Sequence, residues 1–354
     1  MIKENEFLKN LKVHKERPAV DNIKRNDAGV FKLDRSESPV KPPRAVIESI
    51  SGFLKNKNSV NWYGESSARE LREAIAKYCG VKSSQVLATN GSDQAAELIS
   101  NTFLREKDEV VIPVPTFDTF KIWPTMRGSR IIKVPYGLDS GPDAGKIIPA
   151  ISKKTKLIYL VNPYIFTLKE SDIKKIAKAA PDAVIFVDEA YFEFYGKSSI
   201  GLIKNYRNII VTRTFSKGFM LAGLRIGYIV ADAKVIGSIE KVRARYSVNA
   251  VGQAAAIAAL KHRKYVADYA AEVRRSAKYI KEQLEKIGFK VFITNTCFVF
   301  IKHNRLNPGK IVGLLEKRKV FTRALDNPAG YLRMNLGALS SIKKVAAIFK
   351  ELFE

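Results

Sequence analysis

The sequence has few residues of the kinds that build disulfide scaffolds or metal sites. Its 354 residues include two cysteines, Cys79 and Cys297. These lie far apart and without metal-ligand spacing, so neither a disulfide framework nor a zinc site is indicated. The three histidines, His14, His262 and His303, form no cluster along the chain. We therefore expect no bound metal.

Long apolar runs are also missing. No run approaches the ~20 apolar residues that a helix needs to cross a bilayer. The first twenty residues are polar and charged, without the apolar core of a signal peptide. We therefore expect a cytoplasmic protein without a membrane partner. A chain of this length can bury a large core, and one large and one smaller domain are the expected arrangement.

Acidic residues are scarce relative to basic ones. The chain carries 61 Lys+Arg against 35 Asp+Glu, a formal net charge of +26. Such a charge raises the local anion concentration, can steer phosphorylated substrates, and permits loose nucleic-acid binding. The basic residues are scattered, with dense stretches at 241–245 and 261–264, and no zinc-finger or basic-zipper pattern accompanies them. We expect mostly solvated surface charge and no nucleic-acid partner.

The most informative stretch runs from Thr212 to Tyr228 and follows an apolar segment, 208–211, that reads as a buried strand. It places Lys217 between a serine and a glycine. A lysine at a strand exit beside small residues suits a Schiff base to an aldehyde cofactor. Ser216 and Arg225 can both hold a phosphate, which points to pyridoxal phosphate (PLP). Any single lysine of this basic chain is more often a solvated surface residue, so the interpretation depends on further elements.

A second element, 183–191, is an apolar strand that ends in an acid. The carboxyl ends of strands are where parallel α/β sheets place ligand-binding groups. The pyridine nitrogen of PLP needs an anionic partner, which Asp188 can supply, and Tyr191 can donate a hydrogen bond to the ring's phenolic oxygen. Asp188 can also be a simple helix N-cap. That alternative does not explain the pairing of a strand-end acid with a strand-end lysine 29 residues later.

A third element, 85–98, reads as strand, glycine turn and helix. Gly91 permits the tight turn, and Ser92 and Asp93 open the helix. Backbone N–H groups at a helix N-terminus, aided by the helix dipole, bind phosphate. Ordinary N-capping is the alternative, and by itself it is the preferred one. As the third member of a set, the turn predicts the binding site of the cofactor phosphate.

Together these elements resemble the fold-type I, class I/II PLP-dependent aminotransferases, and most of all the histidinol-phosphate aminotransferase branch. The resemblance covers residue 33 to the end of the chain, in the family's order. It implies an α/β fold with a mostly parallel sheet in a large domain and a smaller α+β domain. The segments that carry it are Asn90-Gly91-Ser92-Asp93, Asp188-Glu189-Ala190-Tyr191, Thr214-Phe215-Ser216-Lys217, 221–227 and 331–337.

The resemblance also implies roles for the cofactor-binding residues. Lys217 would form the Schiff base and shuttle the proton between the substrate Cα and the cofactor's C4′. Asp188 would pair with the pyridinium nitrogen, and Tyr191 would contact the phenolic oxygen. Phe117 would stack on the ring, with simple core packing as the alternative. The residues expected around the phosphate are Ser92, Asp93, Thr214, Ser216 and Arg225.

Three further residues acquire roles by the same resemblance. Arg333 would grip the acidic group of the substrate, since a planar guanidinium suits bidentate binding of carboxylate or phosphate. Arg323 would bind the substrate phosphate, with a solvated strand-edge cation as the alternative. Tyr63 would reach the phosphate in the partner subunit, which implies a homodimer with shared sites.

Two segments depart from the family pattern. The family's loop with two Asn-Pro pairs is reduced here to Asn162-Pro163-Tyr164-Ile165, and we assign Asn162 to the ring contact. Ahead of the first strand, Pro18-Ala19 stands where the branch has a substrate-gripping Pro-Tyr. The Asn-rich motif that follows is reduced to the segment 34–39. These changes leave the substrate more open than the chemistry.

The resulting hypothesis is transamination of L-histidinol phosphate, with 2-oxoglutarate as acceptor, through the Lys217 Schiff base. Two alternatives keep the same cofactor: an aromatic amino acid aminotransferase, and a decarboxylase of a phosphorylated amino acid such as threonine phosphate. A third is a basic binding protein without catalysis. We expect the large PLP-binding domain at 46–240, the small domain at 1–45 plus 241–354, and one long helix over 251–287.

Overall fold

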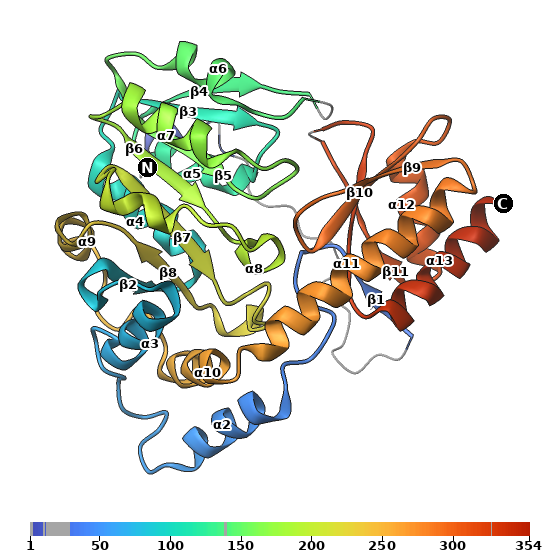
Figure 1. Ribbon diagram of the computed structural model, residues 1–354, viewed down its shortest axis with the longest axis horizontal. Helices are drawn as coiled ribbons and strands as arrows, with labels where there is room; N and C mark the ends of the chain where they lie inside the picture. Colours follow the sequence, from blue (N-terminus) through green and yellow to red (C-terminus); the bar gives the residue numbers. More distant parts are fainter. Residues whose placement is uncertain (1–2, 10, 12–28, 138–139, 327) are drawn as a thin grey trace. The chain divides into compact units, whose positions relative to one another are not determined.

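The computed structural model describes residues 3–9, 11, 29–137, 140–326 and 328–354. The chain divides into two compact units (Figure 1). The first comprises the described residues of Met1–Lys12 together with Pro42–Arg263, and the second those of Val13–Lys41 together with Lys264–Glu354. The change from one unit to the other thus falls at Arg263, whereas the sequence predicted a domain boundary at residue 240.

A seven-stranded sheet forms the centre of the first unit. Its order is β2-β8-β7-β6-β5-β3-β4. All neighbouring pairs are parallel except those of β8, which is antiparallel to both β2 and β7. The strands are β2 (Val86–Thr89), β3 (Glu109–Val114), β4 (Arg130–Pro135), β5 (Thr155–Val161), β6 (Val184–Asp188), β7 (Ile209–Thr214) and β8 (Gly227–Val230).

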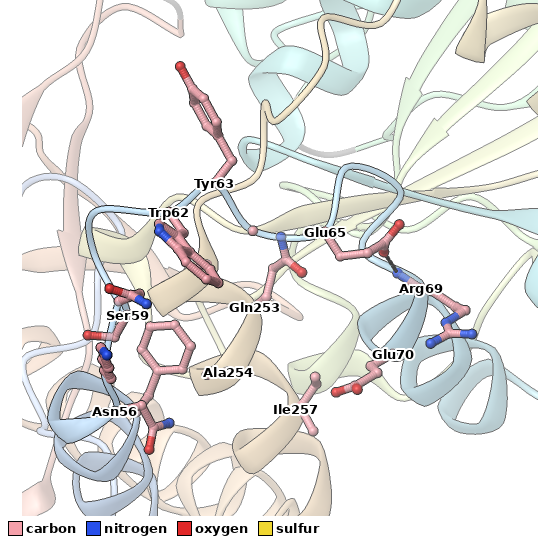
Figure 2. A pocket seen from close by; sticks show the side chains of 15 residues that line it. Asn56, Ser59, Trp62, Tyr63, Glu65, Arg69, Glu70, Gln253, Ala254 and Ile257 are labelled. Atoms are coloured by element: carbon pink, nitrogen blue, oxygen red, sulfur yellow. Dashed lines mark hydrogen bonds between the residues drawn. The ribbon is translucent and has the colours of Figure 1, made fainter.

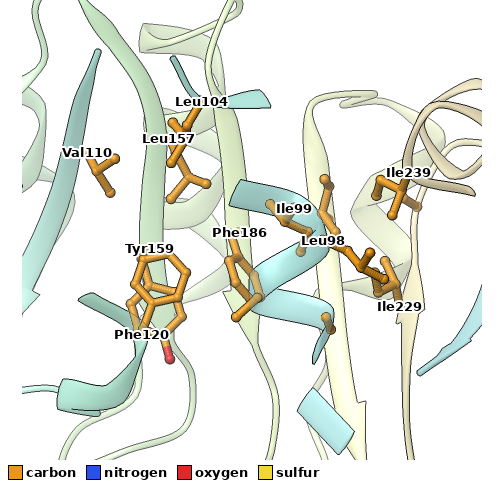
Figure 3. Packing of buried hydrophobic residues seen from close by; sticks show 14 of the residues in the cluster. Leu98, Ile99, Leu104, Val110, Phe120, Leu157, Tyr159, Phe186, Ile229 and Ile239 are labelled. Carbon is orange, nitrogen blue, oxygen red and sulfur yellow. The ribbon is translucent and has the colours of Figure 1, made fainter. Parts of the chain in front are cut away.

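Helices accompany the strands along this part of the chain. In sequence order the α-helices are α2 (Arg44–Lys55), α3 (Arg69–Cys79), α4 (Gly91–Phe103), α5 (Ile122–Met126), α6 (Ala144–Ile147), α7 (Glu170–Ala179), α8 (Phe192–Tyr195), α9 (Ala233–Glu240) and α10 (Ala250–Lys261). Strand β7 is buried at every position, as expected of a central strand with both faces covered. Leu98 and Ile99 of α4 pack into one buried cluster with Phe186 of β6 and Ile229 of β8 (Figure 3).

The second unit contains an antiparallel sheet in the order β12-β13-β10-β9 and a parallel pair, β1 with β11. Its strands are β1 (Phe31–Lys32), β9 (Phe289–Ile293), β10 (Phe298–His303), β11 (Val320–Phe321), β12 (Arg323–Ala324) and β13 (Leu332–Asn335), and its helices are α11 (Lys264–Glu285), α12 (Pro308–Lys317) and α13 (Leu339–Phe353). With the sheet of the first unit, this confirms the predicted fold class.

The prediction of a single helix over 251–287 is wrong. The structure has two helices, α10 and α11, separated at His262 and Arg263. His262 caps α10 with a non-helical ψ of 18°. Neither separating residue is a glycine or a proline, so helix propensity carried no signal of the break. None of the helices in the described ranges is long and apolar enough to cross a membrane.

Candidate active site

The carboxyl ends of β5, β6 and β7 meet at one edge of the large sheet. Val161 is paired with Asp188, and Asp188 with Thr212. The chain therefore leaves three neighbouring strands at this edge, toward Asn162, Tyr191 and Lys217. The sequence predicted these three segments as separate elements, and the parallel register brings their ends together.

The N-terminus of α4 lies beside Arg225. Gly91 has a φ of +73°, and a Cβ placed on it would lie 2.7 Å from Nη2 of Arg225. Arg225 also donates from Nη2 to Asp93, at 2.9 Å. Arg225 itself has a φ of +56°, a left-handed conformation that is uncommon for a non-glycine residue. Ser92, Asp93 and Arg225, predicted from distant motifs, thus come together at the N-terminus of α4, where the first backbone N–H groups have no partner within the helix.

A second glycine permits this approach of β8 to α4. A Cβ on Gly227 would lie 2.6 Å from the carbonyl carbon of Gly91 and 2.8 Å from the backbone nitrogen of Ser92. Both neighbouring atoms belong to backbone, which cannot move aside as a flexible side chain can. The small residue at 227 is therefore required by the helix N-terminus that it touches. The sequence contained Gly227 within a motif but gave no reason for it.

Two hydroxyl groups follow at the end of β7. Thr214 and Ser216 are buried, and Thr214 Oγ1 donates to Ser216 Oγ at 2.9 Å. The backbone N–H of Ser216 donates to Thr214 Oγ1 at 3.1 Å. These bonds fix the turn that leads into Lys217. Lys217 is half-buried and follows directly after Ser216.

Asp188 is buried and accepts three hydrogen bonds. Tyr159 Oη donates to it at 2.9 Å, the backbone N–H of Ala190 at 3.1 Å, and Thr212 Oγ1 at 3.4 Å. Burial raises the pKa of Asp188 to about 6, against the lowering effect of these donors. A cation beside this carboxylate would offset the burial, which suits the predicted pyridinium partner.

Tyr159 also belongs to the candidate site, although the sequence predicted no role for it. It lies within the apolar strand β5, and its ring stacks on Phe120 with 3.7 Å between centroids. Phe120 is buried in the core, and Figure 3 shows the two rings together. The hydroxyl reaches Asp188 because β5 and β6 are adjacent. A tyrosine inside a buried strand was the available signal, because a buried tyrosine hydroxyl needs a partner.

The two predicted aromatic contacts differ in burial. Tyr191 is buried, and its ring centroid lies 6.5 Å from that of Tyr164. Phe117 is 40% exposed. This exposure argues against the core-packing alternative, because Phe120 fills the core position instead. Stacking of Phe117 on a cofactor ring stays a prediction.

The side chain of Asn162 forms hydrogen bonds within the loop that follows β5. Its Oδ1 accepts from the backbone N–H of Leu168 at 2.9 Å, and its Nδ2 donates to the Leu168 carbonyl at 3.4 Å. The side chain is buried. This pairing with backbone is a sufficient reason for an asparagine here, and the predicted contact with a ring oxygen stays a prediction.

A buried ion pair lies next to these elements. Glu189, directly after Asp188, accepts from Nε of Arg213 at 2.9 Å and pairs with its Nη2 at 2.9 Å. Ser198 and the backbone N–H of Ser199 also donate to Glu189. Both charged side chains are almost fully buried. The sequence predicted no role for Glu189 or Arg213.

The two predicted substrate arginines belong to the second unit. Arg323 on β12 and Arg333 on β13 stand directly opposite each other in the antiparallel register. Opposite residues in such a pair share one face of the sheet. Arg323 is exposed, whereas Arg333 is buried and donates from Nη2 to the Asp34 carbonyl at 2.8 Å.

Tyr63 lies on an exposed part of the first unit. It is 82% exposed and stacks on Tyr246, with 4.5 Å between ring centroids. A hollow of about 410 Å³ adjoins it, lined by residues of α2, α3, α10 and the segment 56–65. Figure 2 shows the Tyr63 ring turned away from the other lining side chains, with Trp62 beside the hollow.

Two further expectations concern Pro18-Ala19 and metal binding. Pro18-Ala19 lies outside the described residues. Among the residues that the structure does describe, no group of three or more histidine, cysteine, aspartate or glutamate side chains is arranged to hold a metal ion.

The chain is similar to known proteins in its sequence and in its fold. The family model for aminotransferase class I and II matches residues 28–350. A histidinol-phosphate aminotransferase of Thermoanaerobacter pseudethanolicus is 34% identical over 276 residues, 77% of this chain and 78% of the relative. A dihydroxyacetone phosphate transaminase of Campylobacter jejuni is 35% identical over 338 residues, covering 92% and 91%.

Solved structures show the same fold. The histidinol-phosphate aminotransferase of Clostridium acetobutylicum superimposes with a TM-score of 0.82 at 23% identity, over 91% of this chain and 99% of that one.

Proposed function

This chain belongs to the class I and II aminotransferases, and we propose that its substrate is a phosphate ester, with L-histidinol phosphate as amino donor and 2-oxoglutarate as acceptor. The family and the PLP-dependent aminotransferase activity predicted from the sequence are confirmed. The identity of the donor and acceptor goes beyond what family membership provides.

The residues of the site fit PLP. The N-terminus of α4 with Thr214, Ser216 and Arg225 would hold its phosphate, because backbone N–H groups, hydroxyls and a guanidinium all donate to an anion. Asp188 would hold the pyridine nitrogen. When bound, PLP supplies the electron sink for the bond-breaking step.

Within this site Lys217 holds and moves the proton. It would accept the proton from the donor's Cα and deliver it to the cofactor carbon, a transfer that requires a neutral amine and therefore a pKa below that of an ordinary lysine. Tyr191 would orient the ring by donating to the phenolic oxygen. Phe117 would cover one face of the ring.

The phosphate-ester proposal is based on the opposite positions of Arg323 and Arg333 on neighbouring strands. The Cα atoms of Arg323 and Arg333 are partners in the register, so both side chains stand on one face of the sheet, and a dianion bound there would attract both charges. A phosphate monoester carries such a charge. Arg333 is also fixed by Asp34 and by the Phe298 ring, whose centroid lies 5.3 Å from the guanidinium carbon. The formal charge of +26 would further favour anionic substrates.

A second candidate reaction is amino transfer to or from a three-carbon phosphate ester. The observation that favours it is the Campylobacter jejuni relative, named a dihydroxyacetone phosphate transaminase, which matches this chain over 92% of its length. Both candidates share the phosphate group and differ in the rest of the substrate.

The test is a single-turnover assay of the PLP-loaded protein with one donor at a time. L-histidinol phosphate should convert the cofactor to its amino form, and 2-oxoglutarate should restore it. Histidinol without the phosphate should react at least tenfold more slowly, because it cannot use both arginines. Equal rates with both donors, or a preference for phenylalanine or tyrosine, would overturn the phosphate-ester proposal. Release of carbon dioxide from threonine phosphate would instead indicate a decarboxylase.

We further propose a homodimer in which Tyr63 serves the partner's site. Exposed apolar side chains lie on α2, on the segment 56–65 that carries Tyr63, and at its stacking partner Tyr246, and patches of this kind mark interaction surfaces. They include Ile47, Leu54, Val60, Trp62 and Tyr246. Light scattering should give twice the mass of the 39.6 kDa chain. A monomer that is fully active would contradict the shared site.

A further inference from the structure

Glu193 on α8 is a buried acid to which the proposed reaction gives no role. Both of its carboxyl oxygens are buried, and neither has a hydrogen-bond partner on another described residue. The side chain lies against Gly218, the residue after Lys217. A Cβ on Gly218 would lie 2.6 Å from Cβ, 2.8 Å from Cγ and 3.2 Å from Oε2 of Glu193.

The charges around Glu193 do not balance if it is ionised. Arg213 is the buried cation here, and Glu189 already takes two of its nitrogen atoms. The other titratable groups that interact with this acid are Tyr78 and Cys79 on α3 and Tyr228 on β8, and the cation Arg263 acts in turn on Tyr78. Among the described residues no cation is hydrogen-bonded to Glu193, so ionisation would place a second carboxylate beside the Glu189–Arg213 pair, which is costly. Retaining a proton avoids the cost of this second buried charge.

The pKa of Glu193 agrees with a carboxyl group that keeps its proton. Burial raises it to about 7, against the lowering effects of Arg213 and of the residue's own backbone N–H. Glu189 raises it further. An acid of this kind is largely neutral at pH 6 and largely ionised at pH 8.

We propose that Glu193, as a neutral acid, is a positioning residue that holds the Lys217–Gly218 backbone against α8. The same short helix begins directly after Tyr191. Glu193 therefore joins the segment that carries the ring-contacting tyrosine to the segment that carries the lysine. Ionisation would draw water or a cation toward the buried carboxylate and disturb this contact. The inference rests on the family's use of Lys217 and not on any particular donor.

The first experiment compares Glu193→Gln and Glu193→Ala in the PLP-loaded enzyme. Glutamine reproduces the size and neutrality of the protonated acid, so E193Q should keep at least half of the wild-type kcat at pH 6. Alanine leaves a void beneath Gly218 and should lower kcat about tenfold or more, with KM for the amino donor changed less than twofold, because a misplaced reacting group slows turnover strongly. Glu170→Gln, at an exposed site on α7, is the matched control and should behave as wild type.

The pH profile separates positioning from simple packing. The wild-type kcat should fall as the pH rises through about 7, and E193Q should lack this fall. The pH dependence of the cofactor's visible absorption band should change in the same way. The proposal is overturned if E193Q and wild type share one profile, or if E193Q loses as much activity as E193A. These results are independent of the donor, so they stand apart from the phosphate-ester proposal.

A spectroscopic measurement on the cofactor-free protein completes the test. Infrared difference spectra of the cofactor-free protein between pH 6 and pH 8 should show loss of a protonated carboxyl band. The band should persist in Asp188→Asn and be absent in the Asp188→Asn/Glu193→Gln double variant. If E193Q and wild type gave the same difference spectrum, Glu193 would not change protonation between pH 6 and pH 8; a wild-type spectrum at pH 6 without a protonated carboxyl band absent from E193Q would show that Glu193 is ionised and would overturn the proposal.

Discussion

Tyr159 Oη donates a hydrogen bond of 2.9 Å to Asp188, so two neighbouring parallel strands meet through a tyrosine and an acid at the sheet edge. The bond stabilises the ionised form of Asp188, which is the form that binds a pyridinium nitrogen. Since the ring of Tyr159 stacks on Phe120, its hydroxyl has a fixed position. The ionisation of Asp188, the proposed partner of the pyridine nitrogen, thus depends on a tyrosine held in the core of the sheet.

Tyr159→Phe should weaken PLP binding about tenfold, because a hydrogen bond to a charged group contributes roughly 1.5–3 kcal/mol. The ring stays, so packing and fold should be kept. Absorbance titration of the cofactor-free protein measures the affinity. Tyr269→Phe, which removes a hydroxyl bonded to the Leu336 carbonyl in the second unit, is the control. Equal losses in the two variants would contradict the role of Tyr159.

Lys217→Ala should abolish turnover, because no other group would carry the covalent link and the proton. The protein should still bind PLP through Asp188 and the α4 N-terminus, more weakly. Multiple-turnover assays and the visible spectrum measure the two properties. An exposed lysine, Lys178 on α7, provides the control substitution. Retained turnover in K217A would refute the assignment.

Gly227→Ala should reduce PLP affinity and stability together. The new Cβ would lie 2.6–2.8 Å from backbone atoms of Gly91 and Ser92, so the helix N-terminus must shift. Such overpacking costs about 1–3 kcal/mol. Gly237→Ala is the matched control: Gly237 lies in helix α9 with no atom near its Cβ position, and alanine there should be neutral or slightly stabilising. Thermal unfolding with and without PLP distinguishes the two.

The sequence predicted which segments form the candidate site better than it predicted the contacts between their side chains. Strand-end residues such as Asp188 and Lys217 could be recognised, because apolar strands and their polar ends are local patterns. The fold class followed from the resemblance that these local motifs carry. The contact of Tyr159 with Asp188 could not be predicted, because it depends on which strands become neighbours and in what register.

Other relationships depended on packing that no local pattern encodes. The approach of Gly227 to Gly91 joins segments more than a hundred residues apart. The buried pair Glu189–Arg213 lies near Glu193, whose carboxyl oxygens have no hydrogen-bond partner within the described ranges, and neither feature could be read from the sequence. The break between α10 and α11 was missed because tertiary structure overrode a continuous helical pattern. Asn162 was assigned by resemblance, and its hydrogen bonds to Leu168 became visible only in the structure.

Arg323→Gln should raise KM for L-histidinol phosphate about tenfold or more while leaving kcat within a few-fold. It removes one of two opposed cations, each of which would make a charge-assisted bond to the phosphate. KM for 2-oxoglutarate, which has no phosphate, should rise less. Arg318→Gln removes an exposed arginine that pairs with Glu351 and is the control. An equal rise in KM for both substrates would contradict a phosphate-specific role for Arg323.

The cofactor-free protein should lose stability as the pH rises from about 4 to about 6. Asp188 has an ordinary pKa of 3.8 and a folded-state pKa of about 6, so the folded protein retains a proton that the unfolded chain has lost. The folded state therefore binds more protons in this window, and the free energy of unfolding falls with increasing pH, by on the order of 3 kcal/mol for a shift of this size. Urea unfolding at a series of pH values measures the slope. Asp188→Asn should remove this part of the slope and leave the contribution of Glu193, which extends to about pH 7. Bound PLP should also suppress the Asp188 part of this pH dependence, because a pyridinium partner favours the ionised carboxylate. A slope unchanged by both the substitution and the cofactor would show that Asp188 is ionised throughout.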